Sequence, residues 1–337
     1  MKNILITGGA GFIGSQLGRR LGELGLNVTL VDNMSDGYED NITFEGKRLP
    51  NFVEMDVRNN QFISLTKDID CICHFAATSA LPKCQADPVA AYDNNVTGLV
   101  NVLEAARNCG VKRVIFSSTS AVYENSNKDV YAESEGVHPD LIYSSTKHTG
   151  ENICRSYSET YGMDIIVTRF FNVYGEHQDI RRPIPPFIGY LAREVYFNRR
   201  PTLYNNQDIK RDYVNSSDVL ECLYLMITSK KKYSAEIFNI CSGEGYSVPD
   251  IVKIYEDVAG VKIDPIYDDP SKFWDKFDFL YNGPCPFPRE RMIKEVYKKS
   301  VGSPVKTQEE FGFMPKVTFE NGLKKVYNYC QKQFNLS

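Results

Sequence analysis

The fold of this chain is decided by residues 3–14, which read Asn3-Ile4-Leu5-Ile6-Thr7-Gly8-Gly9-Ala10-Gly11-Phe12-Ile13-Gly14. Residues Lys2–Thr7 form a short apolar run typical of a β-strand, and a helical pattern follows the glycines. Glycines at 8, 11 and 14 permit a tight turn and a close approach of backbone to a pyrophosphate. The start of the helix offers free N–H groups and its dipole to phosphates. The order strand, glycine-rich turn, helix therefore predicts a phosphate-binding turn.

A second signal follows at the end of the next predicted strand, Asn27–Val31. Asp32 stands there, 18 residues after Gly14. A carboxylate at this position accepts a hydrogen bond from a ribose 2′-OH. It also repels a 2′-phosphate, which favours NAD over NADP. Together the two signals predict a dinucleotide site.

The alternation of strands and helices continues through the first half of the chain. Further strands are expected at Phe52–Val57, Cys71–Ala77 and Val114–Ser118, with a long helix over residues 90–109. Repeated βα units predict an α/β fold with a doubly wound, parallel Rossmann-type sheet, whose ligands bind at the carboxyl ends of the strands. Those ends fall at Gly8, Asp32, Asp56, Ala76 and Thr119.

Composition narrows the class of protein. The chain has 337 residues, 42% hydrophobic and 24% charged, with a net charge of −4. This charge argues against a nucleic-acid or anionic-membrane partner, and no apolar run reaches the roughly 18 residues of a membrane span. The N-terminus enters a strand without a signal-peptide pattern, so a cytoplasmic enzyme is expected. The nine cysteines are scattered, which predicts reduced thiols and no metal site.

The stretch Tyr143-Ser144-Ser145-Thr146-Lys147 carries candidate chemistry. On a helix Tyr143 and Lys147 share a face, about one turn apart. A neighbouring ammonium favours the phenolate and lowers the pKa of a tyrosine, which makes it a usable base. The same spacing also occurs in amphipathic helices without chemistry, so the pair gains its meaning from the rest of the chain.

The motifs in combination resemble the extended short-chain dehydrogenase/reductase family, and within it the NAD-dependent nucleotide-sugar epimerases and dehydratases. The resemblance covers residues 1 to about 245 and returns near the C-terminus. It rests on the glycine motif, Asp32, Asp56-Val57, His74-Phe75-Ala76-Ala77, Asn95, Ser117-Ser118-Thr119, Tyr143-x-x-x-Lys147, Arg169-Phe170-Phe171-Asn172-Val173-Tyr174-Gly175 and Arg211-Asp212-Tyr213-Val214.

The resemblance implies bound NAD that oxidises a sugar carbon, usually C4. Tyr143 would take the hydroxyl proton, Lys147 would bind the nicotinamide ribose, and Thr119 would hydrogen-bond the same sugar oxygen. Lys147 and the positive nicotinamide would lower the pKa of Tyr143. Without that role, Thr119 is a strand-end hydroxyl that caps backbone groups. The implied cofactor-binding residues are Gly8, Gly11, Phe12, Ile13, Gly14, Asp32, Asn33, Asp56, Val57, Ala76, Ala77, Asn95, Ser117, Tyr143 and Lys147.

The two residues after Thr119 separate the reactions of the family. Its 4,6-dehydratases carry an acidic or Ser residue and then a Glu there, and the Glu removes a proton at C5. This chain has Ser120-Ala121, and alanine transfers no proton. Glu124 is either a replacement base or an exposed loop carboxylate, and we expect the second. The leading prediction is a nucleotide-sugar 4-epimerase similar to the UDP-glucose 4-epimerases. The alternatives are a C4 dehydrogenase or reductase, a 4,6-dehydratase with a displaced base, and a non-catalytic NAD-binding protein.

The resemblance also implies a division of labour. Residues 1–175 and 212–247 are expected to form the NAD-binding domain, and residues 176–211 and 248–337 a smaller α/β domain for a nucleotide-diphosphate sugar. Arg211 is expected on the diphosphate, with an ion pair to Asp212 or Asp208 as its alternative. A homodimer through residues 90–109 and 143–161 is expected as well. The implied substrate-binding residues are Thr78, Ser79, Ala80, Thr119, Ser120, Asn172, Arg211 and Arg289, with Arg291 as a competitor of Arg289 in an aromatic-rich stretch that departs from the family.

Overall fold

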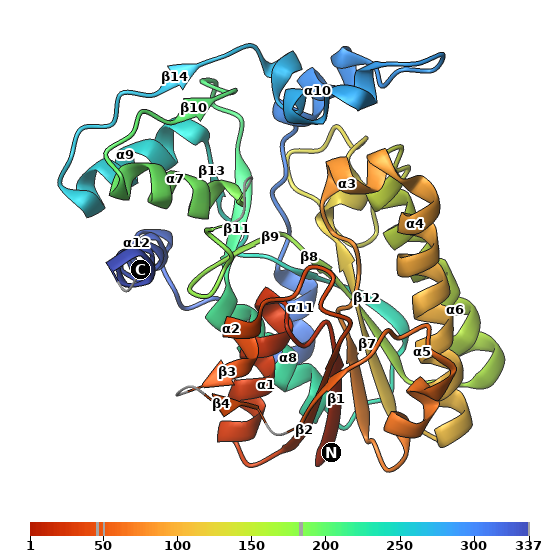
Figure 1. Cartoon of the computed structure of the whole chain (residues 1–337). Helices are drawn as coiled ribbons and strands as arrows, with labels where there is room; N and C mark the ends of the chain where they lie inside the picture. The colour runs from red at the N-terminus through yellow and green to blue at the C-terminus, as the bar shows by residue number, and fades with distance from the viewer. Residues whose placement is uncertain (45–46, 50, 182–184, 336–337) are drawn as a thin grey trace.

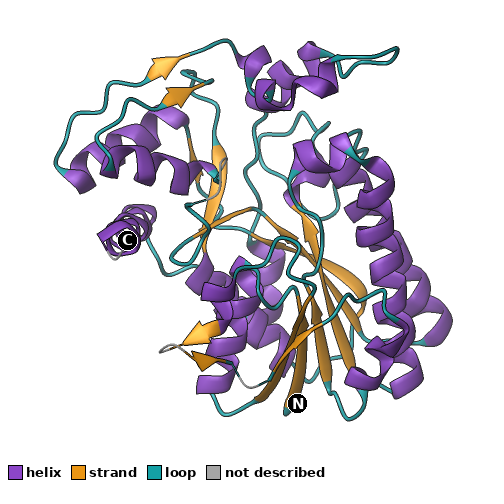
Figure 2. Cartoon of the chain, in the orientation of Figure 1, coloured by secondary structure: helices purple, strands orange, loops and turns teal. Residues whose placement is uncertain are grey.

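The computed structural model describes residues 1–44, 47–49, 51–181 and 185–335. Its centre is a seven-stranded parallel sheet (Figures 1 and 2). Strand β1 lies inside the sheet, with β2 on one side and β6 on the other, so the strand order reverses there. Such a reversal opens a crevice at the carboxyl ends of the strands. The predicted doubly wound Rossmann-type sheet is confirmed. From edge to edge the strands are β12 (Ser234–Ile240), β8 (Ile165–Phe170), β7 (Arg113–Thr119), β6 (Cys71–His74), β1 (Asn3–Thr7), β2 (Asn27–Asp32) and β5 (Phe52–Glu54).

Helices cover both faces of the sheet because successive strand side chains point to opposite sides. Ile4 and Ile6 of β1 belong to one apolar layer, and Leu5 belongs to the other. The first layer includes α1 (Phe12–Glu23), α8 (Ser216–Thr228) and α11 (Val305–Phe311), and the second includes α5 (Gly98–Cys109) and α6 (Ile142–Tyr161) (Figure 1).

Four elements differ from expectation. Strand β5 ends at Glu54, short of the predicted Val57, and β6 ends at His74, short of the predicted Ala77. Strand β8 is not among the predicted strands. The long helix begins before residue 90 and contains a π turn at its centre, since it runs through α4 (Pro88–Tyr92), η2 (Asp93–Thr97) and α5. The remaining elements of the first half are α2 (Glu39–Ile42), β3 (Thr43–Phe44), β4 (Lys47–Arg48), η1 (Asn60–Thr66), α3 (Leu81–Ala86) and η3 (Ser120–Tyr123).

A second group of elements packs above the sheet edge, at the upper left of Figure 1. Its core joins three helices to a small sheet. Ser247 and Asp250 cap the start of α9 reciprocally, and Pro249 lies in its first turn. The group consists of α7 (Phe187–Tyr196), α9 (Val248–Ala259), α12 (Phe319–Asn335), the sheet β13 (Gly245–Tyr246), β11 (Arg211–Asn215) and β9 (Asn172–Tyr174), and the pair β10 (Thr202–Leu203) and β14 (Ile266–Tyr267).

A third group, here called the 270–296 lobe, lies at the top of Figure 1, above α3. It contains η4 (Pro270–Lys272), η5 (Asp275–Tyr281) and α10 (Arg289–Val296). Trp274, Leu280 and Met292 are buried together with Leu141, which immediately precedes α6. The aromatic-rich stretch therefore packs a small core of its own against the start of α6.

All nine cysteines are free thiols, as predicted, and seven of them are buried. Within the described ranges, no helix combines the length and apolarity that crossing a bilayer requires. Across the same residues, no cluster of three or more His, Cys, Asp or Glu side chains has the arrangement of a metal site.

A buried ion pair joins β8 to α6. The Arg169 guanidinium donates to both carboxylate oxygens of Glu151, at 2.9 and 2.7 Å, and both side chains are almost fully buried. Arg169 also donates to the hydroxyl of Tyr123, and Ser118 donates to Glu151. Because β7, β8 and α6 all contribute, this network fixes the height of α6 on the sheet.

We expect Arg169→Met to lower the free energy of unfolding by about 3–5 kcal/mol, because it leaves the Glu151 carboxylate buried without its cation. Urea unfolding followed by circular dichroism measures this loss. Arg169→Met combined with Glu151→Leu should recover most of it. Lys262→Met, which removes an exposed pair with Glu256, serves as the control and should cost less than about 1 kcal/mol. A loss of that small size in Arg169→Met would contradict the bracing role.

Candidate functional site

The turn between β1 and α1 is too tightly packed for side chains. A Cβ on Gly14 would lie 2.2 Å from the carbonyl oxygen of Gly8, and one on Gly8 would lie 2.8 Å from the amide nitrogen of Ala76. Gly8 also has a φ of +71°, which disfavours other residues. Gly11 precedes α1, and no described side chain caps this helix. The turn thus presents bare backbone and a free helix start at the sheet crevice, which fits a dinucleotide pyrophosphate.

Asp32 ends β2 beside this turn. Its two carboxylate oxygens accept hydrogen bonds from the amides of Ala10, at 3.0 Å, and Met34, at 2.8 Å. Burial raises the pKa of Asp32, against the lowering effect of these donors. The carboxylate is therefore fixed next to the glycine turn, where the ribose of a dinucleotide belongs. Phe12 and Ile13, at the start of α1, are partly buried.

The neighbouring strand end carries the next predicted cofactor residues. Asn33 donates to Asp56 at 2.9 Å. The guanidinium of Arg58 also binds this carboxylate, and its hydrogen bonds hold the pKa of Asp56 well below its usual range. The side chain of Val57 is buried in the core. The structure thus brings Asn33 and Asp56 together beside Asp32, with Asp56 already paired inside the protein.

Tyr143, Lys147 and Thr119 meet where β7 ends against the first turn of α6. The hydroxyl of Thr119 is hydrogen-bonded to Tyr143. It also accepts from the amide of Ala121 at 3.1 Å, which is the backbone-capping role of a strand-end hydroxyl. The ammonium of Lys147 donates to the carbonyl of Ser117 at 2.8 Å and lies 5.0 Å from the ring centre of Phe116.

Burial dominates the titration of these groups. It raises the pKa of Tyr143 to about 12, although the hydrogen bond from Thr119 acts in the lowering direction. It lowers the pKa of Lys147 to about 8. The acidic tyrosine expected from the sequence is therefore not a property of the protein alone. A phenolate near neutral pH requires a further positive charge, which the resemblance assigns to the oxidised nicotinamide.

The loop after β6 is held by Asn95 from the π turn. The side chain of Asn95 accepts from the amide of Thr78 at 2.8 Å and donates to the carbonyl of Thr78 at 3.1 Å. It also donates to the hydroxyl of Thr146 on α6 at 3.0 Å. Asn95 is thus a brace between the predicted sugar loop and the helix of Tyr143. In this loop Ala76, Ala77, Thr78 and Ala80 are partly buried and Ser79 is exposed.

Of the predicted substrate residues in the second half, Asn172 and Arg211 lie on the paired strands β9 and β11, and Arg289 lies at the start of α10. Asn172 donates to the carbonyl of Asp212 at 2.7 Å. Arg211 donates to the carbonyls of Glu295 and Val296 in the last turn of α10. The alternative partners, Asp212 and Asp208, form no ion pair with it among the described residues. Instead Asp212 is fully buried and accepts from the backbone and hydroxyl of Ser242. Arg289 is exposed, binds Asp275 at 2.7 Å and stacks 4.0 Å from the ring centre of Tyr281.

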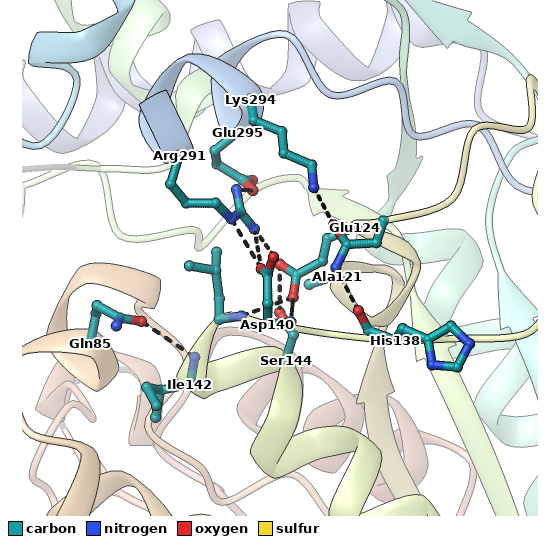
Figure 3. A network of polar contacts seen from close by, with 12 residues as sticks. Gln85, Ala121, Glu124, His138, Asp140, Ile142, Ser144, Arg291, Lys294 and Glu295 are labelled. Atoms are coloured by element: carbon teal, nitrogen blue, oxygen red, sulfur yellow. Dashed lines mark hydrogen bonds and ion pairs between the residues drawn. The ribbon is translucent and has the colours of Figure 1, made fainter. Parts of the chain in front are cut away.

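The expectation for Glu124 is wrong. Its side chain is fully buried and is not an exposed loop carboxylate. It accepts from the amides of Asp140 and Leu141 and from the hydroxyl of Ser144, and it forms an ion pair with Arg291 at 2.8 Å (Figure 3). Burial raises the pKa of Glu124, and these donors and cations act in the lowering direction. No local sequence pattern indicates this pair, because its members are 167 residues apart.

The buried Lys147 generates a prediction about stability and pH. Its pKa of about 8 in the folded protein lies below its ordinary value of 10.5. The unfolded chain therefore binds more protons between pH 8 and 10.5, and the folding free energy improves as pH rises through this window, by up to about 3 kcal/mol.

Lys147→Met removes this titration. We expect urea unfolding of the NAD-free proteins to show wild type gaining stability from pH 7.5 to 10 relative to Lys147→Met. Other titrating groups cancel in the comparison. Parallel stability curves for the two proteins across this range would contradict the prediction.

Comparisons with known proteins agree with this geometry. Residues 4–241 match the sequence pattern described as "NAD dependent epimerase/dehydratase family". A UDP-glucuronate 4-epimerase of Thermodesulfobacterium geofontis is 27% identical, over 100% of this chain and 98% of that protein. The solved structure of the Thermotoga maritima UDP-glucose 4-epimerase with UDP-glucose has a TM-score of 0.85 and 28% identity, over 98% of this chain and 99% of that one. A UDP-N-acetylglucosamine 4-epimerase of Methanobrevibacter ruminantium M1, in complex with UDP-N-acetylmuramic acid, has a TM-score of 0.85 and 26% identity, with the same coverage.

The pattern spans well over half of the chain and contains the glycine turn, Thr119, Tyr143 and Lys147. The chain belongs to the NAD-dependent epimerase/dehydratase family, within the extended short-chain dehydrogenases/reductases.

Proposed function

We propose that this protein is an NAD-dependent 4-epimerase of a UDP-linked hexose. The observation that carries the proposal is the meeting of Thr119, Tyr143 and Lys147 at the sheet edge that also holds the glycine turn. NAD, when bound, supplies the hydride acceptor and donor for transient oxidation of C4. Gly8, Gly11, Gly14 and Asp32 would hold its pyrophosphate and ribose.

The residues of the chain divide the remaining work. Tyr143 takes the proton of the C4 hydroxyl and later returns it. Thr119 is already hydrogen-bonded to Tyr143 and would hold the same sugar oxygen in place. Lys147 is anchored on Ser117 at the end of β7, from where it would bind the nicotinamide ribose and favour the phenolate. Inversion at C4 needs no further acid or base.

Elimination is disfavoured by two side chains. The 4,6-dehydratases of the family that this chain resembles carry a proton-transferring Glu at the second position after Thr119. This chain has Ala121 there, which cannot transfer a proton. Glu124 is the nearest candidate to replace it. Its two oxygens accept two backbone amides, a hydroxyl and a guanidinium, so it is committed to structure.

UDP is proposed as the nucleotide because the similar epimerases are named for UDP-sugars. These names differ in the sugar, so the hexose is left to experiment. Residues 176–211 and 248–337 would bind the nucleotide sugar, with Asn172 and Arg211 beside the diphosphate. A homodimer through α4, α5 and α6 belongs to the same proposal, and Val89, Tyr92 and Tyr161 are exposed on these helices.

The substrate prediction is tested by incubating the purified protein, without added NAD, with UDP-glucose, UDP-N-acetylglucosamine and UDP-glucuronate. We expect NMR to show a C4-inverted product from one or more of them. A 4-keto-6-deoxy product would establish dehydration instead. Consumption of added NADH in proportion to product would establish a reductase.

Tyr143→Phe should lower turnover at least about 100-fold, because it removes the group that exchanges the C4 proton. NAD binding should persist, since the glycine turn is unchanged. Tyr161→Phe, at the opposite end of the same helix, should retain turnover. Turnover of Tyr143→Phe at the wild-type rate would refute the catalytic assignment.

A further inference from the structure

We infer that Arg291 and Glu124 are positioning residues that tie the 270–296 lobe to the helix of Tyr143 and hold Tyr143 against Thr119. This inference rests on the proposed function and adds to it. In the sequence analysis, Arg291 competes with Arg289 for the role of substrate ligand. The inference gives Arg291 a different role.

The first step is the way Glu124 joins two elements. The η3 turn connects Thr119 to Glu124, and two hydrogen bonds stabilise it. The amide of Ala121 donates to the Thr119 hydroxyl, and the amide of Glu124 donates to the carbonyl of Ala121. One carboxylate oxygen of Glu124 accepts from the amides of Asp140 and Leu141, just before α6. The strand end that carries Thr119 is thereby linked to the start of the helix that carries Tyr143.

The second step is the contact with Ser144. The other carboxylate oxygen of Glu124 accepts from the Ser144 hydroxyl at 3.3 Å, and Ser144 is adjacent to Tyr143. This oxygen also receives Arg291 at 2.8 Å. Figure 3 shows the arginine reaching from α10 to the carboxylates of Glu124 and Asp140. Arg291 donates to Asp140 at 3.0 and 2.9 Å, so one guanidinium binds the turn before α6 at two points.

The third step is that the lobe makes an apolar contact at the same place. Leu141 is buried with Trp274, Leu280 and Met292, the last of which follows Arg291 directly. Leu81 of α3 packs against this cluster, and α3 follows the predicted sugar loop. On α3, Gln85 accepts from the amide of Ile142 at 3.3 Å. The lobe therefore contacts the supports of the sugar loop and of Tyr143.

The fourth step is the charge balance. Glu124 is fully buried and Arg291 is 11% exposed, so each side chain depends on the other for compensation. The groups that face this pair are Asp140 from the preceding loop, Glu295 from α10 and Lys298 after it. Tyr143 itself faces the hydroxyl of Thr119 and the thiol of Cys84. The ion pair acts on Tyr143 through position, because it holds the tyrosine beside Thr119, whose hydrogen bond acts to lower the pKa of Tyr143.

The inference is tested by measuring kcat and KM of Arg291→Met across a range of pH, with the UDP-sugar that the wild-type protein epimerises. We expect kcat to fall by about tenfold to 100-fold, as for a small misplacement of a catalytic group. The kinetic pKa of the tyrosine should rise by about half a unit to one unit, because Tyr143 loses its hydrogen bond from Thr119. NAD affinity should be unchanged. Glu124→Gln, which keeps an acceptor for the amides, should have a smaller effect.

Two further variants separate positioning from folding. Arg291→Met with Glu124→Gln should recover part of the lost kcat, because no charged carboxylate is then left at position 124, where the side chain is fully buried. In a Thr119→Val background, Arg291→Met should shift the kinetic pKa no further. Lys299→Met removes an exposed pair with Asp129 nearby and is the control, with wild-type kinetics expected. Thermal unfolding and NAD binding establish that each variant is folded.

The inference would be overturned by a folded Arg291→Met protein with wild-type kcat and pH profile. It would equally be overturned by a raised KM at unchanged kcat, the signature of a phosphate ligand, or by a lower kcat without a pKa shift. Wild-type protein that inverts no UDP-sugar refutes the proposed function instead, so the two failures are distinguishable.

Discussion

The close approach of two backbone segments at the end of β1 constrains the rest of the site. The carbonyl of Gly8 lies where a Cβ on Gly14 would be, and Gly8 in turn contacts the chain that leaves β6. Both segments leave the carboxyl edge of a parallel sheet, so they enclose the crevice where the strand order reverses. The turn fixes one side of the cofactor site, and the end of β7 with the start of α6 fixes the other.

Two charged side chains near Tyr143 are buried. Lys147 and Glu124 are both buried, and each is compensated by partners from a different part of the chain. Lys147 relies on the carbonyl of Ser117, whereas Glu124 relies on backbone amides and on Arg291. Such groups cost free energy unless their geometry is precise, and removing one partner exposes that cost. The site is thereby rigid on both sides of Tyr143, which suits a reaction whose reacting atoms must stay aligned.

The 270–296 lobe links the second half of the chain to the turn before α6. Arg289 pairs with Asp275 on the surface, while Arg291 reaches the turn before α6. The lobe packs on Leu141 through apolar side chains and adds the ion pair beside them. The lobe and α3 therefore both contact the start of α6 through neighbouring side chains.

The parallel sheet, the glycine turn, the family and the NAD dependence could be predicted from the amino-acid sequence, because they depend on local patterns. Residues 3–14 contain a strand, the glycine turn and the start of a helix, and Tyr143 and Lys147 lie about one helical turn apart. Strand β8 was not predicted, since an apolar run buried on both faces lacks the alternation that marks a strand. The partners of Arg291 and Arg211 could be found only from the folded chain. Arg291 lies 167 residues from Glu124 in the sequence, and Arg211 lies 84 residues from Glu295, whose carbonyl it binds. Which of these groups pair depends on the path of the folded chain.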